Sequence, residues 1–317
     1  MTFYVLFFLL VQFICLLGFV LKSKDRNKAI VCCLILMILF SGLNYGKGTD
    51  YISYRNIYND NLYSESFQDI GFYSIVNILN WLELDFNIFI FIIALFNGFL
   101  LYIIIKKLNY KILFLSCYIA GFYLYFQFNA LKQGLSVLMF IVAILYSSRI
   151  IKLIFISLSI SMHSSQIITL LINYTNLKRF LLIFGLLIPL VYFVDKYYSS
   201  YIYLNILEQE KSLYPILIAK SLFCIWIIKF NVKKYWIYIY LILVVLIHFG
   251  FIYFSRYADV IFLILLCEFF KVDQKFKKID YFLILIFISI MQIGTLNIVL
   301  KDCILNKDIW CNYNLLN

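Results

Sequence analysis

The sequence has little charge, little proline and little glycine. Only 14% of its 317 residues are charged and 65% are hydrophobic, whereas an ordinary soluble domain has about 25% charged and 45–50% apolar residues. A water-soluble globule cannot bury this much apolar surface, so that class is excluded. Two prolines and eleven glycines are too few for a disordered or low-complexity chain.

Residues that hold metals and nucleotides are also scarce. The sequence has only two histidines and contains no CxxC pair and no HExxH motif, so it offers no familiar zinc-ligand pattern. It has neither a Walker A loop nor a GxGxxG motif, so neither ATP nor a dinucleotide is indicated. We therefore expect no metal and no cofactor.

The apolar residues are arranged in long runs. A helix needs about 20 apolar residues to cross a bilayer, and candidate runs lie near 3–21, 29–45, 86–105, 112–130, 133–148, 180–194, 213–229, 235–253, 257–270 and 281–300. The first run lacks a basic flank before it, so we interpret it as a retained helix and not as a cleaved signal. The sequence predicts an all-α, polytopic membrane helix bundle of about 10–11 transmembrane segments, forming a single domain over 1–317.

Basic residues gather between these runs. The net charge is +11, but the charges are dispersed and do not form one face, so nucleic acid is not an expected partner. Most of the basic residues fall in six clusters, at 22–28, 106–111, 149–152, 178–179, 229–234 and 271–278. The positive-inside rule places such clusters in the cytoplasm, and the N-terminus then lies outside.

One apolar stretch, 153–173, is interrupted by serines and His163. If this stretch crosses the membrane once, the last three basic clusters fall outside. If it enters from the cytoplasm and returns, all six stay inside. The charge pattern therefore favours a broken or re-entrant helix pair with His163 near its tip, and one tilted crossing is the alternative.

Two connections are long, and we predict them to be outer loops, at 46–85 and 195–212. The first is acidic and contains apolar residues at helical spacing, which indicates an amphipathic helix at the outer interface; these are Phe67, Ile70, Ile75, Ile78, Leu79 and Leu82. The polar tail after 300 contains Cys303 and Cys311, which can pair if the tail faces an oxidising compartment.

The start of the first outer loop contains polar groups suited to sugar and phosphate. Asp50 can take a proton from a sugar hydroxyl, Arg55 can bind a phosphate with two donors, and Tyr51 and Tyr54 can stack on sugar rings. A helix cap followed by a solvated loop is the alternative.

Further candidates lie near helix ends on the predicted outer side. Lys132 lies in a tight turn at 129–134, either facing the same outer space or snorkelling. His163 is costly to bury in an apolar segment unless it is used or paired, and bonding to the adjacent serines is the alternative. Arg256 can pair with Asp259 on one helix face. Lys220 either snorkels or lines a cavity.

These residues resemble motifs of a known family. Gly48-Thr49-Asp50-Tyr51-x-x-Tyr54 is similar to the GxDxxxY segment of EpsG-like and Wzy-type polysaccharide polymerases. The resemblance continues, in the family's order, through Lys132-Gln133-Gly134, Ser161-Met162-His163-Ser164-Ser165, Arg256-Tyr257 and the aromatic tail 310–313. The family commonly has arginine where this chain has Lys132, and lysine keeps the charge but lacks the planar fork.

The resemblance implies a metal-independent membrane glycosyltransferase without a cofactor. Such enzymes join undecaprenyl-diphosphate-linked oligosaccharide repeats into O-antigen, capsule or exopolysaccharide. They are multi-pass proteins that work at the outer face of the bacterial cytoplasmic (inner) membrane, among membrane lipid and beside a flippase and a chain-length regulator. In this interpretation Asp50 or His163 is the base, with Asp50 preferred, and Arg55, Lys132 and Arg256 meet the diphosphate.

Two other functions remain as alternatives. A flippase or transporter for the same lipid-linked sugars would share the outer basic groups. A membrane acyltransferase that modifies surface glycan would use His163 catalytically, but it would leave the acidic, aromatic outer loop unexplained.

Overall fold

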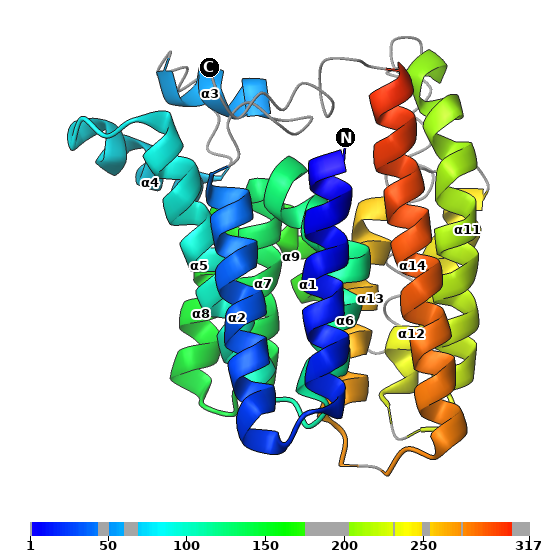
Figure 1. The fold of residues 1–317 in the computed structure, drawn as a ribbon. Coiled ribbons are helices and arrows are strands. Elements are labelled where there is room, and N and C mark those ends of the chain that lie inside the picture. Colours follow the sequence, from blue (N-terminus) through cyan, green and yellow to red (C-terminus); the bar gives the residue numbers. More distant parts are fainter. Residues whose placement is uncertain are drawn as a thin grey trace.

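Helices are the only regular structure in the part of the chain that the computed structural model describes, which is residues 2–43, 51–59, 69–174, 203–230, 232–248, 254–273 and 275–305. The predicted all-helical class is confirmed for these residues (Figure 1). The helices are α1 (Thr2–Val20), α2 (Ser23–Gly42), α3 (Tyr51–Asn59), α4 (Ile70–Trp81), α5 (Phe86–Lys106), α6 (Lys111–Tyr118), η1 (Ile119–Tyr123), η2 (Tyr125–Asn129), α7 (Leu131–Leu145), α8 (Arg149–Met162), α9 (Gln166–Tyr174), α11 (Tyr203–Ile227), α12 (Lys234–His248), α13 (Phe254–Lys271) and α14 (Lys278–Leu305).

Most helices match the predicted apolar runs, and the differences occur where polar helix formers extend a run. Residues 203–212, predicted as part of an outer loop, form the first turns of α11, because Glu208, Glu210 and Lys211 have good helix propensity. In the same way α14 continues through Cys303, which we predicted in a polar tail. The run 180–194, loop residues 195–202 and Cys311 lie outside the described residues.

The predicted amphipathic helix in the first long connection is α4. It buries Phe72, Val76 and Leu79 against the bundle, while Ile78 and Trp81 are exposed. A second short helix in this connection, α3, was not predicted. It buries Tyr54 and Tyr58.

The helix that begins at Lys111 changes its winding midway. Its second half is π-helical through η1 and η2, and it ends where the N–H of Ala130 donates to the carbonyl of Tyr125, five residues earlier (2.9 Å). Ala130 alone separates this helix from α7. A tight connection is present, but it is shorter than the predicted turn at 129–134, because residues 131–134 already form the first turn of α7. π-helical winding of this kind often marks functional sites.

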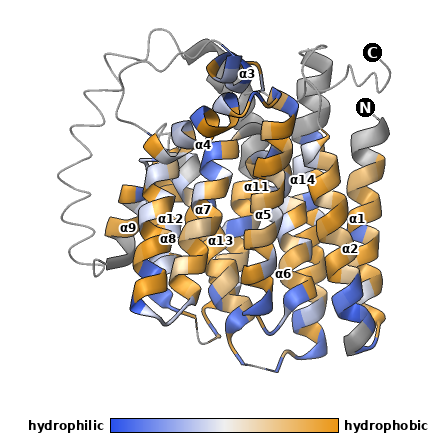
Figure 2. Ribbon diagram, turned by 90° about the vertical axis from the view of Figure 1, so that its left-hand side faces the viewer, coloured by the Kyte–Doolittle hydropathy of each residue, from blue (hydrophilic) through white to orange (hydrophobic). Residues whose placement is uncertain are grey.

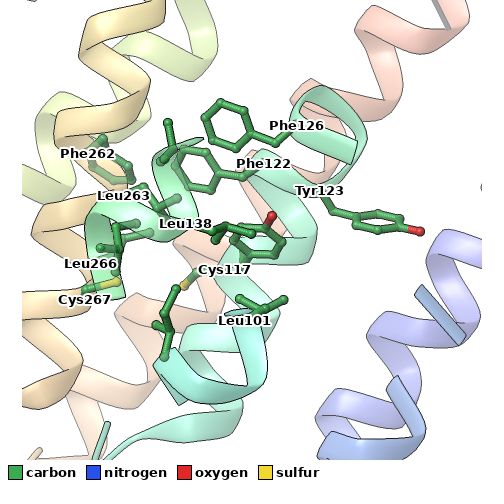
Figure 3. Close-up of a cluster of buried hydrophobic side chains, with 14 of the residues drawn as sticks. Leu101, Cys117, Phe122, Tyr123, Phe126, Leu138, Phe262, Leu263, Leu266 and Cys267 are labelled. Atoms are coloured by element: carbon green, nitrogen blue, oxygen red, sulfur yellow. The ribbon is translucent and has the colours of Figure 1, made fainter. Parts of the chain in front are cut away.

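The centre of the bundle is apolar and aromatic. Buried side chains from α5, α6, η1, η2, α7 and α13 pack together, with the Phe122 ring stacked 5.9 Å from Phe126 and 6.2 Å from Phe262 (Figure 3). Both α7 and the part of α13 after Ala258 are buried on nearly all sides, as expected for helices in the middle of a bundle.

The two ends of the bundle differ. The short turns α1–α2, α5–α6, α7–α8, α11–α12 and α13–α14 meet at one end, opposite α3 and α4 (Figures 1 and 2). Five of the six basic clusters lie in or beside these turns, and we name this the basic end. The sixth, 178–179, lies outside the described residues. We name the opposite end, which carries α3 and α4, the α4 end.

The surface between the two ends is hydrophobic along the helices (Figure 2). Large apolar side chains such as Phe99, Leu153 and Ile293 are exposed, which suits contact with lipid. Two described helices, 86–106 and 278–297, are long and apolar enough to cross a membrane, and five shorter apolar helices accompany them.

The predicted break in 153–173 occurs at His163. Helix α8 ends at Met162, His163 adopts an extended conformation (φ −156°, ψ 111°), and α9 begins at Gln166. The end of α8 meets the start of α4, where Gly71 contacts Ser161. The chain between 175 and 202, which would decide between a re-entrant pair and one tilted crossing, lies outside the described residues.

Candidate functional site

A partly buried polar cluster lies at the α4 end, where α4, α7 and α8 meet. We name it the Asp69 cluster; it consists of Asp69, Lys132, His163 and Ser164. The Asp69 carboxylate lies 2.9 Å from the Lys132 ammonium and 3.3–3.4 Å from Nδ1 of His163, and it accepts the Ser164 backbone N–H at 2.8 Å. Three donors from two later segments of the chain thus converge on one anion.

Asp69 is held in an uncommon backbone conformation. Its φ of 63° and ψ of 37° place it in the left-handed region, which aspartate tolerates better than most residues. It directly precedes α4, but its side chain does not cap that helix and instead reaches α7 and the α8–α9 break. A residue kept in such a conformation is a reason to look for function nearby.

The charge state of Asp69 follows from its partners. Burial alone would raise the pKa of this carboxyl, but the hydrogen bonds from His163, Lys132 and the Ser164 backbone outweigh it and hold the pKa well below its usual value. Asp69 is therefore ionised at neutral pH and can only accept hydrogen bonds. With its pKa this low, Asp69 is a weak general base at neutral pH.

This charge state fixes the proton on His163. Because the Asp69 carboxylate only accepts, Nδ1 of His163 must be the donor in their contact. In the neutral ring, Nε2 then has the free lone pair. A carboxylate that holds an imidazole in this way also stabilises the imidazolium formed when Nε2 takes a proton. The His163 side chain is 24% exposed, so it is partly accessible.

Lys132 lies in the first turn of α7. Its ammonium lies 5.4 Å from the centre of the Phe72 ring and 5.6 Å from that of Tyr73, and its backbone N–H donates to the Tyr54 hydroxyl at 3.5 Å. The positive end of the α7 dipole adds to its charge. Two rings from α4 thus lie near a cation that shares the Asp69 carboxylate with His163.

A pair of serines fixes α7 against α8 one turn below the cluster. The Ser136 hydroxyl donates to the Ser159 carbonyl (2.6 Å), and the Ser159 hydroxyl donates to the Ser136 carbonyl (2.7 Å). Both side chains are fully buried. Since Ser136 follows Lys132 by four residues and Ser159 precedes His163 by four, this serine clamp sets the spacing of the two candidate side chains.

Two glycines permit the close packing around the cluster. A Cβ at Gly134 would collide with the backbone carbonyl of Phe126 in η2, and one at Gly71 would collide with Ser161. Gly134 belongs to the Lys132-x-Gly134 pattern noted in the sequence. Its role is to let the start of α7 approach the π-helical segment.

The structure brings some predicted site residues together and not others. Lys132, His163 and Tyr54 meet in or beside the Asp69 cluster, although Tyr54 is buried and packs on Phe72. Tyr51 faces α5, where its ring packs on Phe86. Arg55 is exposed on α3. Asp50 lies outside the described residues, as does the side chain of Arg256 at the start of α13.

Asp69 was missed as a site residue. It is one of six acids in the first long connection, and no motif distinguishes it. The only local signal is its position just before an amphipathic helix, which predicts an N-cap. No group of three His, Cys, Asp or Glu side chains within the described ranges could hold a metal ion.

Comparisons with known proteins agree with the motifs. No curated protein and no solved structure is significantly similar to this chain. The model of the EpsG family matches residues 27–314, which is nearly the whole chain. The protein is an integral membrane protein with a polysaccharide-polymerase type of function, and it belongs to the EpsG family, the family of Wzy-like polysaccharide polymerases.

Proposed function

We propose that this protein joins undecaprenyl-diphosphate-linked oligosaccharide repeats into O-antigen, capsule or exopolysaccharide. The growing glycan would move from its lipid diphosphate to the non-reducing-end sugar of an incoming lipid-linked repeat. Family membership supports the type of reaction. The Asp69–His163 contact beside Lys132 is the observation that carries the chemistry.

His163 is the base in this proposal. As the acceptor hydroxyl attacks the anomeric carbon of the donor, Nε2 of His163 takes the hydroxyl proton and the bond from that carbon to the phosphate oxygen breaks. The lipid diphosphate leaves with the bonding electron pair. The ionised Asp69 supports the imidazolium through Nδ1. This geometry favours His163 over Asp50, which we retain as a second candidate because it lies outside the described residues.

The leaving diphosphate gains negative charge as the bond breaks, and cations stabilise it. Lys132 shares the Asp69 carboxylate with His163. Arg55 lies on α3 at the α4 end, and Arg256 lies at the start of α13, the end of that helix opposite the α13–α14 turn; we assign both to the diphosphate as well. The proposal requires no metal ion, because these side chains supply the positive charge. No nucleotide is needed either, since the lipid diphosphate is itself the activated donor.

The same arrangement suggests an orientation. The basic end would face the cytoplasm by the positive-inside rule, so the Asp69 cluster would face outward, where flipped lipid-linked sugars arrive. We therefore propose a multi-pass protein of the bacterial cytoplasmic membrane. A flippase and a chain-length regulator of the same pathway are its proposed partners.

Deletion of the gene in its host tests the function. We expect the long surface-glycan ladder to disappear while a single capped repeat remains, and the wild-type gene on a plasmid to restore the ladder. Loss of every repeat from the surface would instead indicate a flippase. A ladder of normal length without acyl groups would indicate an acyltransferase.

A further inference from the structure

Two buried glutamines lie beside the Asp69 cluster, and the sequence did not single out either of them as a site residue. Gln133 follows Lys132 in the first turn of α7, and Gln166 begins α9 three residues after His163. The two glutamines are 6% and 1% exposed. Among the residues that the structure describes, Oε1 of each has no hydrogen-bond partner.

Both glutamines belong to the elements that carry the candidate base and cation. Gln133 precedes Ser136 by three residues, so the two share the face of α7 that meets α8. The backbone N–H of Gln166 donates to the carbonyl of His163 at 3.1 Å, which ties the start of α9 to the α8–α9 break. Helix α9 in turn contacts α7 and α8. The two amides therefore lie around the junction of α7, α8 and α9 that also carries Lys132 and His163.

An acceptor buried without a donor is unfavourable, and an apolar side chain of the same shape avoids the loss. Elsewhere in the bundle a buried polar group does find a partner on another helix, since Lys220 of α11 lies 2.5 Å from Asp259 of α13. The sequence left open whether Lys220 snorkels or lines a cavity, and in the structure it instead makes this ion pair. A buried amide oxygen with no such partner is a reason to look for a ligand that brings the donor.

Position distinguishes the two glutamines from another unpartnered amide. Asn97 is fully buried, and neither of its amide atoms has a partner among the described residues. It follows Phe86, the first residue of α5, by 11 residues, which places it about 16 Å along that helix from the α4 end. Gln133 and Gln166 instead lie in first helical turns at the α4 end, beside a histidine that is 24% exposed.

The unpartnered atoms are acceptors, and this selects the part of the substrate that they fit. The phosphate groups of an ionised diphosphate present acceptor oxygens, so they cannot satisfy another acceptor. Sugar hydroxyls can, because each has an O–H donor. The attacking hydroxyl gives its only hydrogen to His163, so the amides must bind its neighbours on the same sugar ring.

We propose that Gln133 and Gln166 bind hydroxyl groups of the acceptor sugar through their Oε1 atoms and so orient the hydroxyl that attacks. This inference rests on the proposed function and deepens it, because it assigns the acceptor sugar to the junction of α7, α8 and α9. Neither glutamine takes a proton. Their contribution is to hold the reacting hydroxyl in place at Nε2 of His163.

A sugar without its diphosphate tests the proposal. The probe is the free oligosaccharide that mild acid releases from the lipid-linked repeat of the host. Gln133→Met and Gln166→Met remove the amide and keep a side chain of similar length. In detergent, each variant should bind the oligosaccharide about three- to tenfold more weakly than wild type, the effect of one lost hydrogen bond. Saturation-transfer NMR titrations measure the affinity, and no binding by the wild type would overturn the proposal.

Two controls separate sugar binding from packing. Asn97→Leu removes a buried, unpartnered amide away from the cluster and should leave the affinity for the oligosaccharide unchanged. Inorganic pyrophosphate should raise the melting temperature of wild type and of both glutamine variants equally. Weaker binding of both ligands by the glutamine variants, or an equal loss of sugar affinity in Asn97→Leu, would overturn the proposal.

A glutamine that only holds a buried water predicts a different result. Both methionine variants would then bind the oligosaccharide as wild type does, and the proposal would be wrong. If a methionine variant fails to insert, Gln133→Asn and Gln166→Asn keep the amide but withdraw it by one methylene. They should also bind the oligosaccharide more weakly, and unchanged affinity in both would reject the sugar site.

The titration also separates this inference from the proposed function. If the purified wild-type protein joins no repeats but binds the oligosaccharide through both glutamines, the function fails and the sugar site stands. If it joins repeats while both methionine variants bind the oligosaccharide with wild-type affinity, the sugar site fails and the function stands.

Discussion

The two ends of the bundle contain the same kind of ion pair in two different environments. At the basic end, Lys229 pairs with Asp280 and Lys233 with Glu268, and these lysines are 51% and 54% exposed. At the α4 end, Lys132 is 20% exposed and Asp69 only 8%, and the carboxylate also holds a histidine. The carboxylates of the first pairs are also little exposed, Asp280 at 4% and Glu268 at 14%, but water reaches their lysines, whereas the second pair also fixes the proton of a partly accessible base.

The largest expected effect comes from changing His163. The described residues at the basic end include no histidine. His163→Gln should lower the rate of polymer formation about 10³-fold, within the range that general bases contribute. Polymer formed by membranes from a deletion strain measures the rate, and a tag on the protein measures its amount. If membranes that contain the His163→Gln variant retain about a tenth of the wild-type rate, a loss below the range of a general base, His163 is not the base.

Asp69→Asn should have the next largest effect on the rate of polymer formation. The amide of asparagine can donate to Nδ1 of His163, which would move the ring proton to Nε2 and remove the free lone pair. The rate should fall about 10²-fold, at the lower end of what general acid–base catalysis contributes, while the protein still inserts. Lys229→Met breaks the ion pair with Asp280 at the other end and should leave the rate unchanged. An equal loss of rate in Asp69→Asn and Lys229→Met would show that the Asp69 cluster matters no more to the reaction than an ion pair at the basic end.

Gly134→Ala tests the packing beneath the α4 end. The new Cβ would press on a backbone carbonyl in η2, which cannot rotate aside as a side chain can, so the first turn of α7 and Lys132 should shift. Because small displacements near a reacting group are costly, we expect about a tenfold loss of rate. Gly121→Ala is the control, since its Cβ would meet only the flexible end of Met291. A similar loss of rate in Gly134→Ala and Gly121→Ala would show that the close packing of Gly134 on η2 does not position Lys132.

The serine clamp should matter for stability more than for rate. Ser159→Ala removes a buried hydrogen bond between α7 and α8 and should lower the free energy of unfolding by about 1 kcal/mol, seen as a lower melting temperature in detergent. Ser289→Ala removes a hydroxyl that bonds within α14 on an exposed face and should change it less. A larger loss of stability in Ser289→Ala than in Ser159→Ala would contradict the proposed role of the serine pair in holding α7 against α8.

The smallest effect is a pH dependence of stability. The pKa of Asp69 is lower in the folded protein than in the unfolded chain, where it is about 3.9, so its ionised form contributes stability above that value and loses it as the pH falls further. The melting-temperature difference between wild type and Asp69→Asn should therefore persist as the pH falls from about 8 to about 5 and shrink only below about pH 4. A difference that disappears near pH 6 would show that Asp69 titrates there.

Much of the fold could be predicted from the sequence because apolar runs and basic clusters are local. Runs such as 86–105 and 112–130 became helices, and the serines around His163 marked the break between α8 and α9. Helix ends were less predictable, as at 203–212, because polar residues with high helix propensity continue a helix past its apolar part.

The site was only partly predictable because its contacts join distant residues. Lys132 and His163 each stood out as polar groups in apolar surroundings. Nothing near Asp69 in the sequence shows that it meets both, and nothing near Asp259 shows that Lys220 would be its partner. The π-helical winding of η1 and η2 changes hydrogen-bond register without changing composition, so the apolar pattern of that run does not reveal it.

The separation of Asp69 from its donors has a consequence for synthesis of the protein. Lys132 follows Asp69 by 63 residues and His163 by 94, and ribosomes add about 5–20 residues per second. The carboxylate therefore emerges several seconds before its partners, and the early helices must insert while it is still unpaired. All the donors to Asp69 come from α7 and the α8–α9 break, so the cluster is completed only when α8 has been added. Helix α4 therefore docks after the helices on which it packs have formed.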